Sequence, residues 1–302
     1  MSGSGSYADW IAVDWGTSNV RAWAMRAGQP VADATSDKGM GTLDPNGFEA
    51  ALLDVIGDWL GSGPMPVIAC GMLGAKQGWT EAPYARVPCP PVSASTARPP
   101  VTDPRLDVTI LPGLSQAKPA DVMRGEETQI AGFLAQTPGF DGVSCLPGTH
   151  RKWAQISAGE VVSFRTFMTG ELFALLSRHS VLRHSIGPGW DDDAFAEAVA
   201  EAMSRPEALA GRFFSLRAES LLSDLAPATA RARLSGLLIG AELAAARPYW
   251  LGQRIALIGD DGLVGAYIAA LDAQGAMSET ADATQCTLAG LTAAFQTLKE
   301  TS

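Results

Sequence analysis

The chain is poor in the residues that build metal sites and disulfide frameworks. It has three histidines and four cysteines in 302 residues. The cysteines, Cys70, Cys89, Cys145 and Cys286, are scattered and form no Cys-x-x-Cys pair, and the histidines complete no zinc-ligand spacing. We therefore expect reduced thiols and no zinc centre.

Positive charge and long apolar runs are also scarce. Lys and Arg total 22 against 32 Asp and Glu, and the formal net charge of -10 argues against nucleic acid as a partner. No stretch is apolar over the ~18 residues that a membrane helix needs. The first residues also lack the basic segment and apolar run of a signal peptide. These absences predict a cytoplasmic protein without a membrane partner.

Hydrophobic residues, in contrast, are abundant. They make up 47% of the chain and charged residues 18%, a balance that excludes a disordered protein and provides a sizeable core. At roughly 150 residues per domain, the length predicts one large or two medium domains.

Two segments have the pattern of strand, short turn and strand. In the first, WIAVD and VRAWAM flank a turn at residues 16–19, and in the second, VSCL and RKWAQIS flank PGTH. Neither segment has the glycine pattern of a P-loop or of a dinucleotide fingerprint. Because helix-rich sequence follows each hairpin, the two hairpins suggest corresponding parts of two similar halves.

Asp14 ends the first of these strands and stands beside the small residues Gly16, Thr17, Ser18 and Asn19. Small residues let backbone N–H groups and hydroxyls approach an anion closely. A single carboxylate beside such a turn suits Mg²⁺, which keeps several waters and also binds substrate phosphates. The alternative is an ordinary hairpin turn in which the carboxylate of Asp14 is satisfied locally.

Apolar periodicity and helix-start signals indicate an α/β protein. Residues 83–104, rich in Pro, Ser and Thr, are expected to form a long irregular excursion. Buried strands are predicted at residues 66–70 and 255–259, and helices at residues 48–60, 126–134, 194–203, 234–246, 262–271 and 284–298. In the small-residue segment SGLLIGAE, Gly236 and Gly240 are expected to permit close packing of two elements.

Six blocks of sequence, in this order, resemble the 2-dehydro-3-deoxygalactonokinase family: DWGTSNVRAW, GMLGAKQGWTEAPY, MRGEETQ, LPGTHRKW, FRTFMTGELF and SGLLIGAE. The family belongs to the sugar-kinase, Hsp70 and actin superfamily. The resemblance implies two ribonuclease-H-like (actin-like ATPase) domains with ATP and Mg²⁺ in the cleft between them. It also implies phosphorylation of 2-dehydro-3-deoxy-D-galactonate at its terminal hydroxyl group, giving the 6-phosphate in D-galactonate catabolism.

From the resemblance we expect an N-terminal domain over residues 7–120 and a C-terminal domain over residues 121–302. The arrangement also allows the terminal helix to pack back on the first domain. The first phosphate loop is expected in the first domain, and the second phosphate loop and the adenosine region in the second.

The resemblance also transfers roles to individual residues. The first phosphate loop is matched by Asp14, Gly16, Thr17, Ser18 and Asn19, and the second by Gly148, Thr149 and His150. Two such loops would supply the positioning and electrostatic stabilisation on which phosphoryl transfer depends. Lys152 either adds charge to the second loop or, by strand alternation, lies on a solvated surface, which we favour.

The general base is expected at Glu126. Related glycerol-kinase-like enzymes carry an Asp in a Gly-Asp-Gln segment, and Gly125, Glu126 and Glu127 are the comparable residues here. Glu127 is an adjacent competitor, and a helix-capping role for the pair is the structural alternative. A position at a helix N-terminus would keep the acid ionised, as a base requires.

A small anionic substrate with a keto group and hydroxyl groups needs a cation for its carboxylate and polar or aromatic walls. The substrate-binding residues predicted from the blocks are Arg21, Lys76, Trp79, Tyr84 and Arg124. For the second anchor of ATP, the superfamily's adenosine turn corresponds to Gly259 and Gly262, although Asp260 and Asp261 break its usual double glycine.

Two other functions compete with this one. The first is a kinase for a related sugar acid, such as the gluconate epimer, because no motif fixes the hydroxyl stereochemistry. The second is a non-catalytic nucleotide switch or sugar sensor of the actin and Hsp70 type, although the chain leaves little room for a partner-binding module. The oligomeric state is expected from base rates alone to be a homodimer.

Overall fold

The computed structural model describes residues 7–93 and 95–300, so the expectations for the first six residues lie outside it. Contacts divide the chain into two compact units. Unit 1 holds the described residues up to Phe140, Ser157–Ser163 and the chain from Ala283 onward, and unit 2 holds Asp141–Ile156 and Phe164–Asp282. Unit 1 includes residues 121–140, which were expected in the second domain, and the C-terminal helix, which the sequence analysis allowed to pack back on the first domain.

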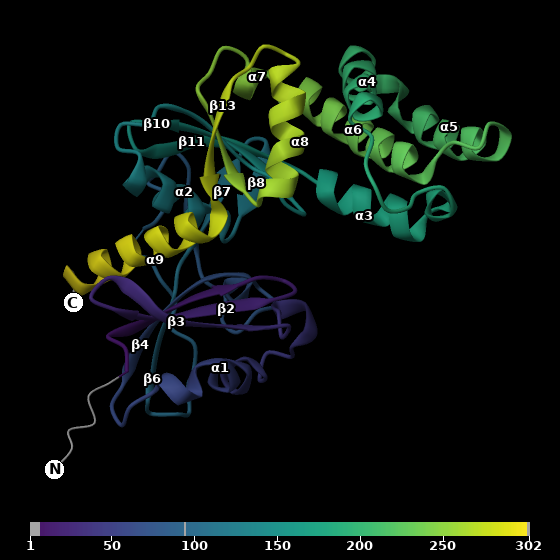
Figure 1. The fold of residues 1–302 in the computed structure, drawn as a ribbon. Helices are drawn as coiled ribbons and strands as arrows, with labels where there is room; N and C mark the ends of the chain where they lie inside the picture. Colours follow the sequence, from purple (N-terminus) through teal and green to yellow (C-terminus); the bar gives the residue numbers. More distant parts are fainter. Residues whose placement is uncertain (1–6, 94, 301–302) are drawn as a thin grey trace. The chain divides into compact units, whose positions relative to one another are not determined.

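Unit 1 is built on a five-stranded sheet of order β3-β2-β1-β4-β6 (Figure 1). Its strands are β1 (Trp10–Trp15), β2 (Val20–Arg26), β3 (Gln29–Ser36), β4 (Met65–Gly71) and β6 (Leu106–Ile110). The strands β1, β2 and β3 are antiparallel neighbours, whereas β4 runs parallel to both β1 and β6. The predicted first hairpin is thus confirmed as β1 and β2. A smaller sheet pairs β5 (Tyr84–Arg86), β7 (Gly113–Ala117) and β8 (Ala120–Met123).

The helices of unit 1 are α1 (Phe48–Ile56), α2 (Glu126–Gln136) and α9 (Ala283–Glu300). Side chains alternate along β1, so Ile11 and Val13 pack in one core cluster with residues of α1. Trp10 and Ala12 pack in another cluster with residues of α9, and α9 also packs along α2. By the same alternation Asp14 lies on the α9 face of the sheet.

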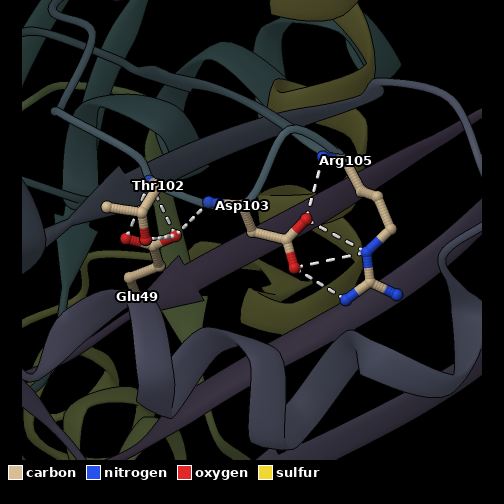
Figure 2. A network of polar contacts seen from close by, with 4 residues as sticks. All are labelled: Glu49, Thr102, Asp103 and Arg105. Atoms are coloured by element: carbon tan, nitrogen blue, oxygen red, sulfur yellow. Dashed lines mark hydrogen bonds and ion pairs between the residues drawn. The ribbon is translucent and has the colours of Figure 1, made fainter.

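The expected irregular excursion is present with one difference. The chain forms the short strand β5, and the described residues from 87 to 105 then form no helix or strand. The end of this segment is tied to α1, because Thr102 and Asp103 donate hydrogen bonds to the carboxylate of Glu49 (Figure 2). Side-chain and backbone hydrogen bonds from Arg105 lower the pKa of Asp103 to about 2.

Unit 2 has a five-stranded sheet of the same spatial layout, in the order β11-β10-β9-β12-β13. Its strands are β9 (Gly142–Leu146), β10 (Arg151–Ser157), β11 (Glu160–Phe167), β12 (Ile255–Gly259) and β13 (Ser278–Asp282). The last residue of β10 and the part of β11 up to Ser163 belong to this sheet, although the division by contacts counts them with unit 1. The second predicted hairpin is confirmed as the antiparallel pair β9 and β10, and β12 runs parallel to both β9 and β13. Two units with the same strand order confirm the α/β class and the expected similarity of the two halves.

Helices make up the rest of unit 2. They are α3 (Thr169–His179), α4 (Asp192–Ser204), α5 (Leu209–Leu222), α6 (Pro227–Ala245), α7 (Arg247–Trp250) and α8 (Asp261–Asp272). Figure 1 shows α4, α5 and α6 beside one another, and both α4 and α5 contact α6. A Cβ atom on Gly236 or on Gly240 would lie 2.5 Å from a backbone oxygen of α4. The predicted close packing at these two glycines is therefore confirmed.

Two expectations drawn from absences can be compared with the described residues. All four cysteines are free thiols. Among residues 7–93 and 95–300, no helix combines the length and the apolar character that a membrane crossing requires.

Candidate active-site residues in the two units

Asp14 is held between the two strands that flank β1. On one side Arg21 of β2 is its direct partner in the register, and Arg21 Nη2 lies 2.6 Å from Asp14 Oδ2. On the other side Cys70 of β4 is in register with it, and the thiol donates to Asp14 Oδ1 over 3.8 Å. Arg21 Nη1 also donates to Thr284 Oγ1 at the start of α9, at 2.9 Å. Asp14 is therefore fixed in position, and Arg21 forms an ion pair with its carboxylate.

The first turn is fixed by a loop that the sequence analysis did not single out. The carbonyl oxygens of Gly16, Thr17 and Ser18 accept hydrogen bonds from the backbone N–H groups of residues 40, 41 and 39, at 3.0, 2.8 and 3.2 Å. Gly16 N in turn donates to Asn19 O at 2.8 Å and closes the hairpin. The residues Thr17, Ser18 and Asn19 are exposed. The turn is thus a rigid, exposed set of small residues beside Asp14.

Both predicted candidates for the base lie at the N-terminus of α2, where the helix begins at Glu126 after Gly125. Glu127 accepts a hydrogen bond from Gly125 N through both carboxylate oxygens, at 2.8 and 2.7 Å. Glu126 Oε2 accepts from Arg124 N at 3.1 Å. Both carboxylates therefore fold back onto backbone N–H groups at the positive end of the helix, which favours negative charge there.

Burial separates the two acids. Glu127 is only 1% exposed, whereas Glu126 is half-buried. Burial, followed by the negative charge of Glu126, raises the pKa of Glu127 to about 7. The hydrogen bonds from Gly125 and the nearby Arg124 act in the opposite direction. Glu127 is therefore the acid whose protonation changes near neutral pH.

Cys70 connects Asp14 with the start of α2. Its buried thiol interacts with Asp14 and Glu127 and forms a hydrogen bond with the side chain of Thr128. Burial and then these two carboxylates raise the pKa of the Cys70 thiol well above its ordinary value. The thiol is consequently a neutral group between two acids. Unit 1 thus brings Asp14 and Glu127, the neighbour of the predicted base Glu126, into one cluster.

Arg124 precedes these acids and has donors without partners. Its side chain is buried, Nη2 donates to Ala82 O at 2.8 Å, and the guanidinium carbon lies 4.3 Å from the ring centroid of Tyr84. Within the described residues, Arg124 Nε and Nη1 are buried and have no hydrogen-bond partner. Burying a donor without a partner costs about 1–3 kcal/mol. An anion that accepts from these atoms would recover that cost.

The remaining predicted substrate residues of unit 1 are placed differently. Trp79 is buried in the core, where its ring stacks with Phe48 at a centroid distance of 6.2 Å. A ring packed in this way offers no wall to a ligand, so Trp79 is assigned to the core instead. Lys76 is exposed on the turn after β4.

In unit 2, the second turn packs on the start of α3. His150 Nε2 lies 2.7 Å from Glu171 Oε2, and Glu171 N donates to Thr149 O at 3.0 Å. A Cβ atom on Gly170 would lie 2.2 Å from Gly148 O, so only glycine permits this contact. The block FRTFMTGELF therefore supports the second turn through Gly170 and Glu171, two residues that the sequence analysis did not identify.

The expected surface position of Lys152 is wrong. Lys152 is buried, and its Nζ donates to His150 O at 3.1 Å. Arg151, which was not singled out from the sequence, is also buried, and its Nε donates to Gly148 O at 3.3 Å. Two cations therefore support the backbone of the second turn from within unit 2.

The predicted adenosine region borders a pocket of about 480 Å³ in unit 2. Gly262 and Ala266 of α8 form one wall, and the pocket also contains aromatic and polar side chains: Phe173, Trp190, Asp192, Arg231 and Ser235. Gly259 lies elsewhere, because a Cβ atom on it would lie 3.5 Å from Pro147, the residue before the second turn. The structure thus places Gly262 at the pocket and Gly259 beside the turn.

The described surroundings of Asp14 contain few potential metal ligands. Among the described residues, no three His, Cys, Asp or Glu side chains are grouped as a metal site. Mg²⁺ does not require such a group, since one or two carboxylates with water and substrate phosphates suffice. The carboxylate of Asp14 fits this requirement. Arg21 contacts its Oδ2, but in the described part of the chain Oδ1 contacts the neutral thiol of Cys70 and not a second cation that would compete with Mg²⁺.

Several known proteins are similar to this chain over most of its length. The sequence profile of the family 2-keto-3-deoxy-galactonokinase matches residues 14–294. A curated 2-dehydro-3-deoxygalactonokinase of Rhizobium meliloti (strain 1021) is 38% identical and covers 99% of both chains. The Escherichia coli (strain K12) enzyme of that name is 36% identical over 89% of this chain and 91% of its own.

A crystal structure from Sinorhizobium meliloti, also described as a 2-dehydro-3-deoxygalactonokinase, superposes with a TM-score of 0.89. It is 38% identical in sequence, and the superposition covers 96% of this chain and 99% of that chain.

Proposed function

The chain belongs to the 2-keto-3-deoxy-galactonokinase family, and we propose that the clusters described in units 1 and 2 carry its reaction. It is an ATP-dependent sugar-acid kinase with the actin-like fold of that family. It phosphorylates 2-dehydro-3-deoxy-D-galactonate to the 6-phosphate in D-galactonate catabolism. A non-catalytic switch or sensor is therefore set aside.

The assignment of roles depends mainly on one observation in unit 1. Asp14, which precedes the exposed first turn, and Glu127, which follows Glu126 at the start of α2, both interact with Cys70 within a single unit. Kinases act mainly by positioning and by electrostatic stabilisation. A fixed carboxylate, an exposed turn of small residues and a nearby acid are the groups that such a reaction needs.

Glu126 is the proposed general base. It accepts the proton of the terminal hydroxyl group while the hydroxyl oxygen forms a bond to the γ-phosphorus of ATP. The bond from that phosphorus to the β–γ bridging oxygen breaks, and ADP leaves. Glu126 is favoured over Glu127 because it is half-buried, whereas Glu127 is almost fully buried and has both carboxylate oxygens on Gly125 N.

Asp14 is proposed to hold Mg²⁺. The ion, when bound, would neutralise charge on the phosphate groups. Arg21 then has a different role from the one expected, because its guanidinium group is occupied by Asp14 and Thr284. We assign it the role of holding the Asp14 carboxylate in place rather than binding the sugar acid.

ATP is proposed to bind unit 1 through the first turn and unit 2 through the second turn and the pocket beside Gly262. The residues Gly148, Thr149 and His150 would face phosphate groups, with the charges of Arg151 and Lys152 beneath the turn. The pocket has aromatic rings for stacking, and polar side chains for the edge of a purine.

Arg124 is the proposed anchor for the substrate carboxylate. Two of its donors, Nε and Nη1, are buried without a hydrogen-bond partner among the described residues, and a carboxylate accepts strong, charge-assisted hydrogen bonds from a guanidinium group. The ring of Tyr84 covers the guanidinium group and is itself 39% exposed. The Tyr84 side chain would therefore turn aside to admit the carboxylate. Lys76, which is exposed, remains the second candidate.

Substrate identity can be tested by product analysis. The protein is incubated with ATP and Mg²⁺ and with 2-dehydro-3-deoxy-D-galactonate, its gluconate epimer or no acceptor. The expected result is a product of the galactonate substrate whose mass has increased by one phosphoryl group. NMR should show that the phosphorus is bound to the terminal oxygen. Faster turnover of the gluconate epimer, or ADP release that needs no acceptor, would contradict the proposal.

Two further points stay predictions. The homodimer was expected from base rates alone, and light scattering coupled to size exclusion measures it. A cytoplasmic location agrees with four free thiols, and cell fractionation tests it.

A further inference from the structure

Unit 2 contains a buried carboxylate that the proposed reaction does not use. Glu242 lies on α6, and this residue is only 3% exposed. The inner residues of this helix are otherwise mostly small or apolar. Removing a carboxylate from water is expensive, and apolar replacements of buried ion pairs often leave stability unchanged or higher. Fold stability alone is therefore a weak reason for an acid at this position.

The carboxylate of Glu242 accepts hydrogen bonds from side chains of three other elements. Glu242 Oε1 accepts from Trp153 Nε1 of β10 at 2.8 Å and from the Tyr267 hydroxyl of α8 at 2.7 Å. Its Oε2 accepts from the hydroxyl of Thr169, the first residue of α3, and lies 3.5 Å from Arg151 Nη1. The elements that carry these donors are the ones that form the second turn and the pocket.

Arg151 connects this carboxylate to both features. Its Nη1 donates to the Tyr267 hydroxyl at 2.6 Å, and that hydroxyl donates onward to Glu242. Its Nε donates to Gly148 O in the second turn at 3.3 Å, and the side chain also lines the pocket that Gly262 borders. The guanidinium group thus has one edge on the turn and the other on the Glu242 and Tyr267 pair.

We propose that Glu242 is a positioning residue for nucleotide binding: through Arg151 and Tyr267 it fixes the second turn and the adjoining pocket in one geometry. The inference rests on the proposed function, in which unit 2 binds ATP. Glu242 does not touch the nucleotide. Its charge keeps Arg151 directed at Gly148 O, so the turn is already ordered before ATP binds. The loss of binding free energy that accompanies ordering of the turn is therefore smaller.

Three variants separate positioning from simple stabilisation. Glu242→Gln keeps the size of the side chain and removes its charge, and Tyr267→Phe removes the hydroxyl between Arg151 and Glu242. Trp153→Phe is the matched control, because it removes another donor to Glu242 Oε1 and leaves the contacts of Arg151 intact. For each variant, the affinity for ADP is measured by calorimetry, KM for ATP and for the sugar acid by kinetics, and Tm by thermal unfolding.

The expected result is a selective loss of nucleotide affinity. Glu242→Gln should raise KM for ATP and the Kd for ADP about tenfold, the size of effect of a lost hydrogen bond to a charged group. Its KM for the sugar acid should stay within about twofold, and Tyr267→Phe should change in the same direction. Trp153→Phe should lower Tm while leaving the Kd for ADP within about twofold.

Other outcomes would overturn the inference. If Glu242→Gln lowers Tm and binds ADP as tightly as the wild-type protein, Glu242 is structural only. Should that variant not fold, unchanged ADP affinity in Tyr267→Phe has the same consequence. Failure of the wild-type protein to bind ADP would overturn the proposed function as well, which distinguishes the two failures.

Discussion

Asp14 and Arg21 face each other across the hairpin of β1 and β2, and Arg21 Nη2 lies 2.6 Å from Asp14 Oδ2. Because the guanidinium group also bonds to Thr284, it holds the carboxylate in one orientation. This contact therefore orients the carboxylate that we propose to hold Mg²⁺.

The first prediction concerns the metal. Asp14→Asn should raise the Mg²⁺ concentration needed for half-maximal activity and lower activity at fixed Mg²⁺ by about tenfold or more, because a carboxylate is a far better Mg²⁺ ligand than an amide. Activity is measured in a Mg²⁺ titration, and circular dichroism monitors the folded state. A variant that unfolds at room temperature would instead favour a role for Asp14 in the turn alone.

The second prediction concerns the stability of the fold as a function of pH. Burial raises the pKa of Glu127 to about 7 in the folded state, above its ordinary value of 4.5. A raised folded-state pKa means that the folded state binds the proton more tightly. The contribution of Glu127 is therefore fully present below pH 4.5 and is lost as the pH rises through 7.

The measurement is urea unfolding of the wild-type protein and of Glu127→Gln at several pH values. Between pH 4.5 and 7 the free energy of unfolding of the wild-type protein should fall relative to that of the variant, by an amount on the order of a few kcal/mol. Parallel profiles for the two proteins would contradict the raised pKa.

The third prediction separates the two candidate cations for the substrate carboxylate. Arg124→Lys should raise KM for the sugar acid about tenfold or more, because a lysine ammonium group cannot place donors at both the Nε and the Nη1 positions of the guanidinium group. KM for ATP should change little. Lys76→Gln, at an exposed position, is the control and should leave KM for the sugar acid within about twofold. The reverse ranking would move the anchor to Lys76.

The sequence predicted the parts of the fold that have strong local signals. Both hairpins have apolar strands around turns of small residues, α6 contains a run of almost uniformly apolar and small residues, and α8 has apolar residues four positions apart. Even the contact of Asp14 with Arg21 was accessible in principle. A hairpin closed between Gly16 and Asn19 places these two residues opposite each other. The ion pair between Asp14 and Arg21 was not predicted, because the sequence analysis assigned Arg21 to substrate binding.

Other features depend on contacts that no local pattern contains. Lys152 was expected on the surface from strand alternation, but it is buried, and its charge is directed at the carbonyl of His150. Alternation identifies a solvated face only where one face of a sheet is open. Glu242 gives no local signal either, since its donors are 25 to 89 residues away in sequence. Trp79 was assigned to the substrate from its block alone, although stacking with Phe48 places it in the core.

A comparison of two variants shows whether the kinase reaction uses Glu126 at the start of α2 as its base. Acceptor-dependent ADP release is measured at saturating ATP, Mg²⁺ and 2-dehydro-3-deoxy-D-galactonate for the wild-type protein, Glu126→Gln and Glu127→Gln, and ADP affinity is measured alongside. Glu126→Gln should lower kcat by about 10²- to 10⁴-fold with ADP affinity nearly unchanged, and Glu127→Gln should lower kcat by less than about tenfold. Unchanged turnover in Glu126→Gln, or the larger loss in Glu127→Gln, would show that Glu126 is not the base.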